Sequence, residues 1–263
     1  MLLDVKNLAV SYGKAKSPTI SGVNFNLNDG EILAIVGESG SGKTTVIRAI
    51  LNVLPGGGFV SNGSIVFEGK NLSELDAEGW RNLRGKNISM IFQDSGNMMN
   101  PVHTIGKQFV EYIQVHSDLD KKSAWKMAIE KLELMNLPNP DNILKSYTFE
   151  LSGGMRQRVG IAMAITFQPK LLLADEPTSA LDVTTQAQIV GELMFITRGS
   201  GAAMIIVTHN IGVASYLADN LMVMAKGRVI EYGKTENVIK HPQEEYTRNL
   251  LASVPEIGGK RYV

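Results

Sequence analysis

The sequence predicts an α/β protein whose mainly parallel β-sheet is covered by helices on both faces. Short apolar runs that suit buried strands alternate with segments of helical patterning. A glycine-rich loop follows one of these runs and opens a helix, which is typical of a ligand-binding edge of such a sheet. From about residue 94 to residue 167 the β-branched runs disappear, and this stretch predicts a helical insertion.

The bulk composition is that of an ordinary folded protein with one large domain or two small ones. Of the 263 residues, 44% are hydrophobic, and 26 lysines and arginines balance 26 aspartates and glutamates. This balance argues against a general nucleic-acid binder or a polybasic membrane-surface protein. The sequence contains no cysteine, so disulfides and thiolate metal sites are excluded. Its apolar runs are far shorter than the ~18 residues of a membrane helix, and the N-terminal MLLDVKNLAV is not typical of a signal peptide, so a membrane role would require partner subunits.

The N-terminal third predicts strands around one helix. The strands are expected at Leu2–Val10, Ile20–Leu27, Glu31–Val36, Ser64–Glu68 and Asn87–Phe92. Residues 28–30, Asn-Asp-Gly, predict a turn, and a helix is expected at Lys43–Leu54 because Pro55 and three glycines follow it.

The middle of the chain predicts helices, and strand–helix alternation returns after it. Helices are expected at Val102–His116, Lys121–Asn136 and Ser152–Phe167, and Pro138, Pro140 and Asp141 mark a break between two of them. The elements expected next are Lys170–Ala174, Ala203–Thr208, Leu221–Ala225 and Arg228–Glu231 as strands, with Thr184–Arg198 and Ile211–Ala218 as helices. The tail after Lys234 predicts one or two further helices.

A phosphate-binding loop is predicted at Gly37–Thr44, which matches the pattern G-x-x-x-x-G-K-S/T. Its glycines let successive backbone N–H groups point inward, and the helix that begins near Lys43 adds its positive end. An ordinary glycine loop before a helix is the alternative, but the preceding strand and the following helix are the context that a P-loop requires.

Three side chains at the end of this loop have predicted chemical roles. Lys43 supplies a mobile cation for the β- and γ-phosphates, Thr44 offers a hydroxyl to Mg²⁺, and Thr45 offers another to the α-phosphate. The residues assigned to nucleotide binding are Gly37, Ser39, Gly40, Ser41, Gly42, Lys43, Thr44 and Thr45.

Two carboxylates end the apolar run that begins at Leu171. Strands of a parallel sheet deliver ligands at their carboxyl ends, so Asp175 is placed to hold Mg²⁺ directly or through water. Glu176, the next residue, is placed to polarise the attacking water. A polar turn before Pro177 is the alternative, which the P-loop elsewhere in the chain disfavours.

The run LSGGMRQR at Leu151–Arg158 resembles the signature of the ABC ATPase family, with Met155 where glutamine is most common. The resemblance implies that Ser152, Gly153 and Gly154 contact the γ-phosphate of ATP bound to an opposite subunit. The same residues would also begin a helix with a serine N-cap, and both interpretations can hold together.

Other motifs of the family occur in the expected order. Tyr12 resembles the aromatic residue that stacks on adenine, and Gln93 resembles the glutamine that senses Mg²⁺ and the γ-phosphate beside the membrane-subunit contact. Residues 179–182, which end at Asp182, resemble the D-loop at the dimer interface. His209 resembles the switch histidine that holds the γ-phosphate and orients Glu176. The implied catalytic residues are therefore Glu176, His209 and Gln93, and the implied metal ligands are Thr44, Gln93 and Asp175.

The resemblance covers nearly the whole chain. It implies a P-loop NTPase core with an N-terminal antiparallel β-subdomain and an inserted α-helical subdomain, all within one ATPase domain over residues 1–263. The core would comprise residues 1–93 and 168–233, the helical subdomain 94–167, and a C-terminal helical tail 234–263. It also implies ATP and Mg²⁺ as cofactors, and two such domains that close head to tail around ATP.

The finer resemblance is to ATPases of oligopeptide, dipeptide and nickel importers. It is carried by Met90–Pro101, Ile161–Ile165, Ala174–Ala187 and the tail His241–Pro255. Many peptide-importer members have a longer C-terminus with cysteines, whereas this chain is similar to the short, cysteine-free ATPases of nickel or metal-chelate importers. We therefore expect a nickel or metal chelate as solute and keep a di- or oligopeptide open.

The implied partners are those of an importer. They are a homologous second ATPase in a heterodimer, two transmembrane permease subunits and, indirectly, an extracytoplasmic solute-binding protein, with no nucleic acid. The chain would lie peripherally on the cytoplasmic face of the cell membrane. A non-transport ATPase of DNA repair or the ribosome is the alternative class, but the single cassette without cysteines, heptads or positive net charge disfavours it.

Overall fold

The computed structural model describes residues 1–13, 17–179, 181–253, 256–257 and 260–261. Within the predicted motifs, Ala180, Val254 and Pro255 lie outside the described residues. The chain divides into two compact units, which we call the first unit (Met1–Glu78 with Gly201–Val263) and the second unit (Gly79–Ser200).

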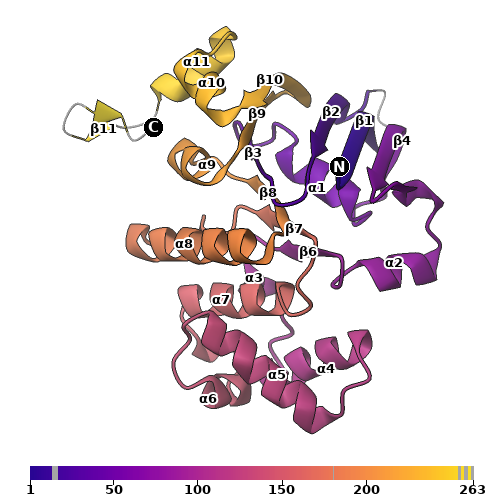
Figure 1. Ribbon diagram of the computed structural model, residues 1–263, viewed down its shortest axis with the longest axis vertical. Helices are drawn as coiled ribbons and strands as arrows, with labels where there is room; N and C mark the ends of the chain where they lie inside the picture. Colours follow the sequence, from indigo (N-terminus) through magenta and orange to yellow (C-terminus); the bar gives the residue numbers. More distant parts are fainter. Residues whose placement is uncertain (14–16, 180, 254–255, 258–259, 262–263) are drawn as a thin grey trace. The chain divides into compact units, whose positions relative to one another are not determined.

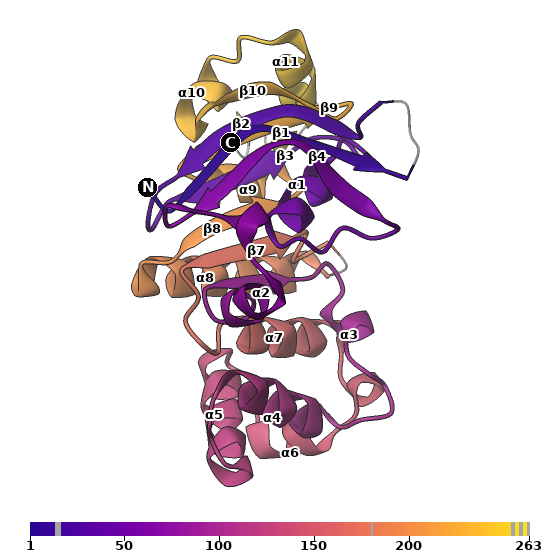
Figure 2. The ribbon, with the colours of Figure 1, turned by 90° about the vertical axis from the view of Figure 1, so that its right-hand side faces the viewer.

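The first unit contains an antiparallel sheet in the order β2-β1-β4-β5. Its strands are β1 (Leu3–Tyr12), β2 (Ile20–Leu27), β4 (Gly58–Phe67) and β5 (Lys70–Asn71), and Figure 2 shows the three longer ones side by side. Apolar side chains alternate with polar ones along β2, as in a strand with one buried face. The register of β1 and β4 is interrupted after Lys6, where Asn7 has a φ of 49° and Gly63 on the opposite strand has a φ of 90°.

The first unit also contains parallel strands with both faces buried. β3 (Ile32–Val36) lies between β8 (Ala203–Val207) and β9 (Asn220–Ala225) and is parallel to both, whereas β10 (Arg228–Lys234) pairs antiparallel with β9. β3 and β8 are buried along their whole length, as their continuous apolar sequences predict. The helices of this unit are α1 (Lys43–Ile50), α9 (Ile211–Leu217), α10 (Thr235–Lys240) and α11 (Glu245–Ala252), with the 3₁₀ turn η1 (Leu72–Glu74).

The second unit combines a parallel strand pair with helices. β6 (Ile88–Ile91) pairs in parallel with β7 (Leu171–Asp175), and helix α7 (Gly153–Ala164) packs against β6. Its other helices are α3 (Ser95–Met98), α4 (Ile105–His116), α5 (Lys121–Leu134), α6 (Pro140–Lys145) and α8 (Val183–Ser200), with η2 (Thr148–Glu150); α2 (Ala77–Leu83) begins in the first unit. Figure 1 shows α4, α5 and α6 packed together. Phe109 on α4 is fully buried.

The predicted fold class is confirmed: the protein is α/β, with an antiparallel N-terminal sheet, parallel strands, and helices through residues 95–164. Some element predictions are wrong in their bounds. α1 ends at Ile50 rather than at Leu54, and β4 begins at Gly58 rather than at Ser64. The predicted break around Pro138 contains helix α6, whose first residue is Pro140.

Two further observations concern the C-terminal residues and the length of the helices. β11 (Glu256–Ile257) and β12 (Lys260–Arg261) form a two-stranded antiparallel pair. Across the described ranges, no helix is long and apolar enough to cross a membrane.

Candidate functional site

The loop between β3 and α1 has a backbone that only glycine suits at two points. Gly37 and Gly42 have φ values of 148° and 101°. A Cβ atom on Gly37 would lie 2.1 Å from the carbonyl oxygen of Met224, and one on Gly42 would lie 2.4 Å from Cγ2 of Ile20. The glycines of the pattern are therefore required by close packing as well as by the turn.

The same loop presents positive groups toward its interior. The Nζ atom of Lys43 donates hydrogen bonds of 2.8 Å to the carbonyl oxygens of Gly37 and Glu38, so the lysine spans the loop. Its side chain is buried, with the residue 4% exposed. No side chain caps the N-terminus of α1, and its first turn has no acidic residue, so the positive end of the helix is not neutralised there.

Ser41 supplies an independent sign of a missing ligand in this loop. Its Oγ atom is buried and has no hydrogen-bond partner among the described residues. Buried hydroxyls in folded proteins are normally hydrogen-bonded. The glycine cradle, Lys43, the uncapped helix and this hydroxyl together fit the phosphates of a nucleotide.

Tyr12 is the last residue of β1 and lies opposite Gly58 in the ladder with β4. A Cβ atom on Gly58 would lie 2.4 Å from Cε1 and 2.8 Å from Cδ1 of Tyr12, so the ring covers the glycine backbone. Gly58 was not singled out from the sequence. The signal available was its place in the run of glycines after Pro55.

His209 lies at the same sheet edge as the loop. β3 and β8 are parallel with Ile35 opposite Val207, so the residues that follow both strands emerge together. The N–H of Thr208 donates to the carbonyl of Ile35 at 3.1 Å, and the exposed His209 follows directly. The first unit thus places the loop and His209 at one edge.

The second unit has a corresponding edge at the ends of β6 and β7. Ile91 lies opposite Ala174, so Gln93, Asp175 and Glu176 all lie at the carboxyl ends of this strand pair. Asp175 is buried, whereas Gln93 is exposed. Glu176 has a φ of 44°, a left-handed conformation that is uncommon outside glycine.

These three residues carry oxygen ligands. Mg²⁺ in proteins prefers carboxylate, water and phosphate oxygens. The carboxylate of Asp175 and the amide oxygen of Gln93 therefore suit Mg²⁺, as does the hydroxyl of Thr44 on α1 in the first unit.

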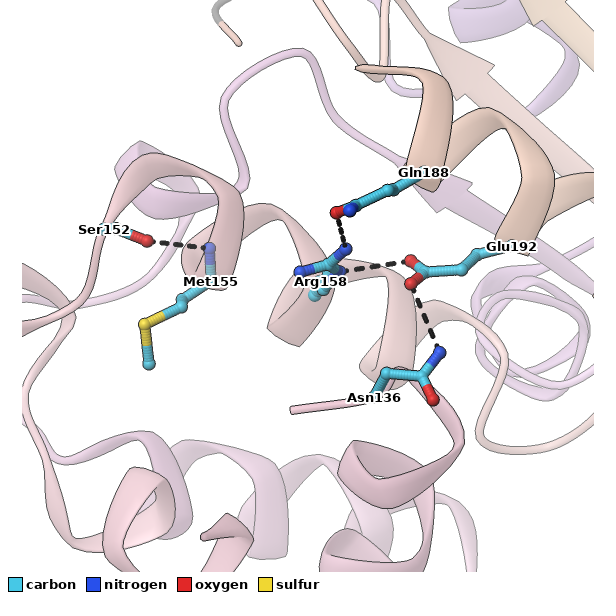
Figure 3. A network of polar contacts seen from close by, with 6 residues as sticks. All are labelled: Asn136, Ser152, Met155, Arg158, Gln188 and Glu192. Carbon is cyan, nitrogen blue, oxygen red and sulfur yellow. Dashed lines mark hydrogen bonds and ion pairs between the residues drawn. The ribbon is translucent and has the colours of Figure 1, made fainter. Parts of the chain in front are cut away.

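The signature residues form the N-terminus of α7. The Oγ atom of Ser152 accepts a 3.3 Å hydrogen bond from the N–H of Met155, which confirms the predicted N-cap (Figure 3). Ser152 and Gly153 are exposed. A Cβ atom on Gly154 would lie 3.0 Å from Cγ2 of Thr185 on α8, so the signature and the start of α8 are close neighbours.

Asp182 anchors the start of α8. Its carboxylate accepts hydrogen bonds from the N–H of Thr185 at 3.0 Å and from the Thr185 hydroxyl at 2.7 Å. These bonds, the hydroxyl first, hold the pKa of Asp182 below its usual value. The second unit therefore brings Asp182 and the signature glycines together.

A polar network also joins α7 to α8. The guanidinium of Arg158 contacts Glu192 through Nε at 3.2 Å and Gln188 through Nη2 at 2.9 Å (Figure 3). Asn136 donates a 3.4 Å hydrogen bond to the other oxygen of Glu192. The network borders a surface cavity of about 830 Å³ between the end of α5, α7 and α8.

Several known proteins are similar in sequence to this chain. The family model described as ABC transporter matches residues 20–179. The oligopeptide transport ATP-binding protein OppD of Bacillus subtilis is 45% identical over 260 residues, which cover 97% of this chain and 72% of that protein. The dipeptide transport ATP-binding protein DppD of Haemophilus influenzae is 40% identical and covers 97% of this chain and 78% of its own length.

Solved structures show the same fold. The ATP-binding cassette MJ0796, solved as a dimer in a post-hydrolysis state with ADP and Pi, is similar with a TM-score of 0.78 and 27% identity over 89% of this chain and 99% of its own. The protein cbiO1 from Clostridium perfringens, part of an ABC transporter complex, gives a TM-score of 0.76 and 29% identity over 97% of this chain and 96% of its own.

Proposed function

Because the chain belongs to the ABC transporter family, we propose that it is the ATP-hydrolysing subunit of an importer for di- or oligopeptides. The loop at Gly37–Thr44 is the observation that carries the nucleotide-binding part of this proposal. Its buried Lys43, its unpartnered Ser41 hydroxyl and the uncapped N-terminus of α1 all suit an anionic ligand.

The assigned roles begin with nucleotide binding. The backbone N–H groups of residues 37–45 and the Lys43 ammonium bind the phosphates, and the Thr45 hydroxyl contributes to the α-phosphate. The ring of Tyr12 stacks on the adenine base, which is worth roughly 1–3 kcal/mol for a base on an aromatic side chain. Binding is thus divided between a phosphate cradle and one aromatic contact.

Hydrolysis is assigned to three side chains. Glu176 orients the attacking water and accepts its proton at a carboxylate oxygen, a contribution of typically 10²–10⁴-fold. His209 orients Glu176 and holds the γ-phosphate, and Gln93 senses the same phosphate. The left-handed backbone at Glu176 supports this assignment, because strained residues cluster at functional sites.

Mg²⁺ belongs to the proposal through Thr44, Gln93 and Asp175. When bound, this ion neutralises the negative charge that develops on the transferred phosphoryl oxygens. The oxygen ligands of these three residues are the type that Mg²⁺ prefers.

We assign the signature residues Ser152, Gly153 and Gly154, with Asp182, to contacts across a dimer of ATPase subunits. The dimeric MJ0796 cassette supports such a pairing. The partner is proposed to be a homologous second ATPase, so that each finished site combines residues from two chains. The division into core (1–93 and 168–233), helical subdomain (94–167) and tail (234–263) belongs to the same proposal.

The names of the relatives support one of the two solutes that the sequence analysis considers. OppD and DppD are named for oligopeptide and dipeptide transport, which favours a peptide over nickel or a metal chelate. Their transport names also favour the importer over a non-transport ATPase. The proposed partners are two transmembrane permease subunits, with an extracytoplasmic solute-binding protein acting through them, and the proposed location is the cytoplasmic face of the membrane.

The test of the proposal separates binding from hydrolysis. Lys43→Ala is expected to abolish binding of a fluorescent ATP analogue, whereas Glu176→Gln should bind ATP normally and lose hydrolysis by at least 100-fold. His241→Ala serves as the matched control for His209→Ala, since only the second should depress hydrolysis. Normal ATP affinity in Lys43→Ala would refute the P-loop assignment.

The solute is tested in the reconstituted transporter. Peptides presented with the binding protein are expected to stimulate ATP hydrolysis, whereas nickel chelates should leave the rate at its basal value. The reverse pattern would overturn the peptide assignment and leave the ATPase assignment standing.

A further inference from the structure

Gln157, on the signature helix α7, forms a two-point contact with the segment that carries Gln93. Its Oε1 atom accepts a 3.3 Å hydrogen bond from the N–H of Ser95, and its Nε2 atom donates a 3.0 Å hydrogen bond to the carbonyl of Phe92. The two partners lie immediately before Gln93 and two residues after it. Gln157 is buried, with 4% of the residue exposed.

We propose that Gln157 is a positioning residue that fixes Gln93 to the signature helix, so that the two motifs move together. The inference rests on the proposed function, in which Gln93 acts on bound nucleotide and Ser152–Gly154 acts on the opposite site. It adds a physical connection between these two roles within one chain.

The packing beside Gln157 supports a rigid connection. Gly160, one turn further along α7, lies directly beneath Ser95. A Cβ atom on Gly160 would lie 2.2 Å from Oγ and 2.3 Å from Cβ of Ser95. The segment and the helix are therefore in close contact, which glycine permits.

A second side chain of α7 covers the same segment. A Cβ atom on Gly96 would lie 2.6 Å from Cδ and Nε of Arg156, so the arginine lies over that glycine. Nη1 of Arg156 also donates a 2.8 Å hydrogen bond to the carbonyl of Leu151, just before the signature residues. Residues 92–96 therefore contact three residues of α7, at positions 156, 157 and 160.

An amide side chain suits the position of Gln157. The N–H of Ser95 needs an acceptor and the carbonyl of Phe92 needs a donor, and a glutamine supplies both at once. Glutamate at neutral pH would accept but not donate. Methionine of similar length would leave the N–H of Ser95 without its acceptor and the carbonyl of Phe92 with the 3.5 Å hydrogen bond from the Ser95 hydroxyl. An unpaired buried backbone group is costly, so the segment would move to find other partners.

The first experiment compares Gln157→Met with Gln108→Met in the full chain, assembled with its proposed partner ATPase. Gln108 is the matched control because its amide bonds the backbone of the next loop, at Asn100 and His103, and not the residues that flank Gln93. We expect Gln157→Met to lower kcat for ATP hydrolysis roughly 10-fold or more with KM changed less than about 2-fold, since a small misplacement of a positioned group can cost up to ~100-fold. Gln108→Met should keep its kcat within about 2-fold of wild type.

A double mutant tests whether Gln157 acts through Gln93. Gln93→Ala with Gln157→Met should be no slower than Gln93→Ala alone, because the positioned group is already absent. Rate losses that multiply in the double mutant, or a folded Gln157→Met with wild-type kcat, would overturn the inference.

Gly160 and Ser95, which lie in contact, allow a further test in which Gln157 is unchanged. Gly160→Ala is expected to lower kcat by pushing Ser95 away, and adding Ser95→Gly should restore it by removing the atoms that clash. A Gly160→Ala variant with wild-type kcat, or no recovery in the pair, would contradict the proposal.

Amide hydrogen exchange gives a readout that does not depend on activity. The N–H of Ser95 should exchange at least about 10-fold faster in Gln157→Met than in wild type or Gln108→Met, and equal rates would contradict the contact. Failure of the proposed function is a different result, because the wild-type chain would then not bind ATP and its assembly with the second ATPase would not hydrolyse it.

Discussion

The ion pair between Arg158 and Glu192 is the contact whose loss we expect to destabilise the second unit most clearly. The side chains are 17% and 13% exposed, so both charges are largely removed from water. Among the residues that the structure describes, substituting Arg158→Met leaves the Glu192 carboxylate with the hydrogen bond from Asn136 at 3.4 Å. Loss of one partner of a fully buried pair costs about 3–5 kcal/mol, and the remaining exposure reduces our expectation to about 2–3 kcal/mol.

The chain contains a suitable control for this substitution. Lys126 and Glu130 form an ion pair at 4.0 Å on α5 in the same unit, with side chains 81% and 58% exposed. Exposed helical pairs of this kind contribute about 0.3–0.5 kcal/mol. Lys126→Met should therefore change the free energy of unfolding by less than 1 kcal/mol.

Urea unfolding followed by tryptophan fluorescence measures both variants in the relevant unit. The chain has 2 tryptophans, and both of them, Trp80 and Trp125, lie in the second unit. With a slope of roughly 2 kcal/mol per molar urea, Arg158→Met should lower the midpoint by about 1 M. Adding Glu192→Gln should recover much of the loss, because no charge then remains buried alone. A loss for Arg158→Met no larger than that for Lys126→Met would refute the reasoning.

Two further predictions concern the nucleotide site and pH. Gly58→Ala should displace the ring of Tyr12 and weaken ATP binding about 5-fold or more in a fluorescence titration, because a lost base stack costs roughly 1 kcal/mol or more. Inorganic tripolyphosphate, which has no base, is the control ligand and should bind to the variant as it binds to the wild type. Burial lowers the pKa of His116, and the charges of Lys86 and Arg81 lower it further, so the unfolded chain binds this proton more tightly than the folded one. The free energy of unfolding should therefore fall as pH decreases below about 6.5 and stay level above it, and thermal unfolding of His116→Gln should lack this part of the decrease.

Local sequence signals predicted most elements, and the misses have local physical reasons. Proline before or within an apolar pattern predicts a break, yet Pro140 begins α6, because the first helical position needs no N–H donor. Asn139 with a φ of 49° precedes it and turns the chain into the helix. β4 was predicted too short because Gly58 and Gly63 weaken its pattern, whereas pairing with β1 holds the whole strand.

The candidate site was predictable where its residues are adjacent in sequence. The loop at Gly37–Thr44 and the pair Asp175–Glu176 each form one local pattern, and strand direction alone places them at sheet edges. The contacts of Gln157 with residues 62 and 65 positions away, and of Arg158 with Glu192, follow from tertiary packing. No periodicity in a single sequence indicates such partners.

The left-handed backbone at Glu176 has a consequence for how this position tolerates change. A residue with a side chain costs roughly 1–2 kcal/mol in that conformation, whereas glycine adopts it freely. Glycine also gains about 0.5–1 kcal/mol of freedom in the unfolded chain, so the backbone contribution alone, without the contacts of residue 176, would make Glu176→Gly about as stable as the wild type or slightly more stable. The backbone conformation therefore favours glycine at this position, whereas the proposed role of Glu176 in hydrolysis requires its carboxylate.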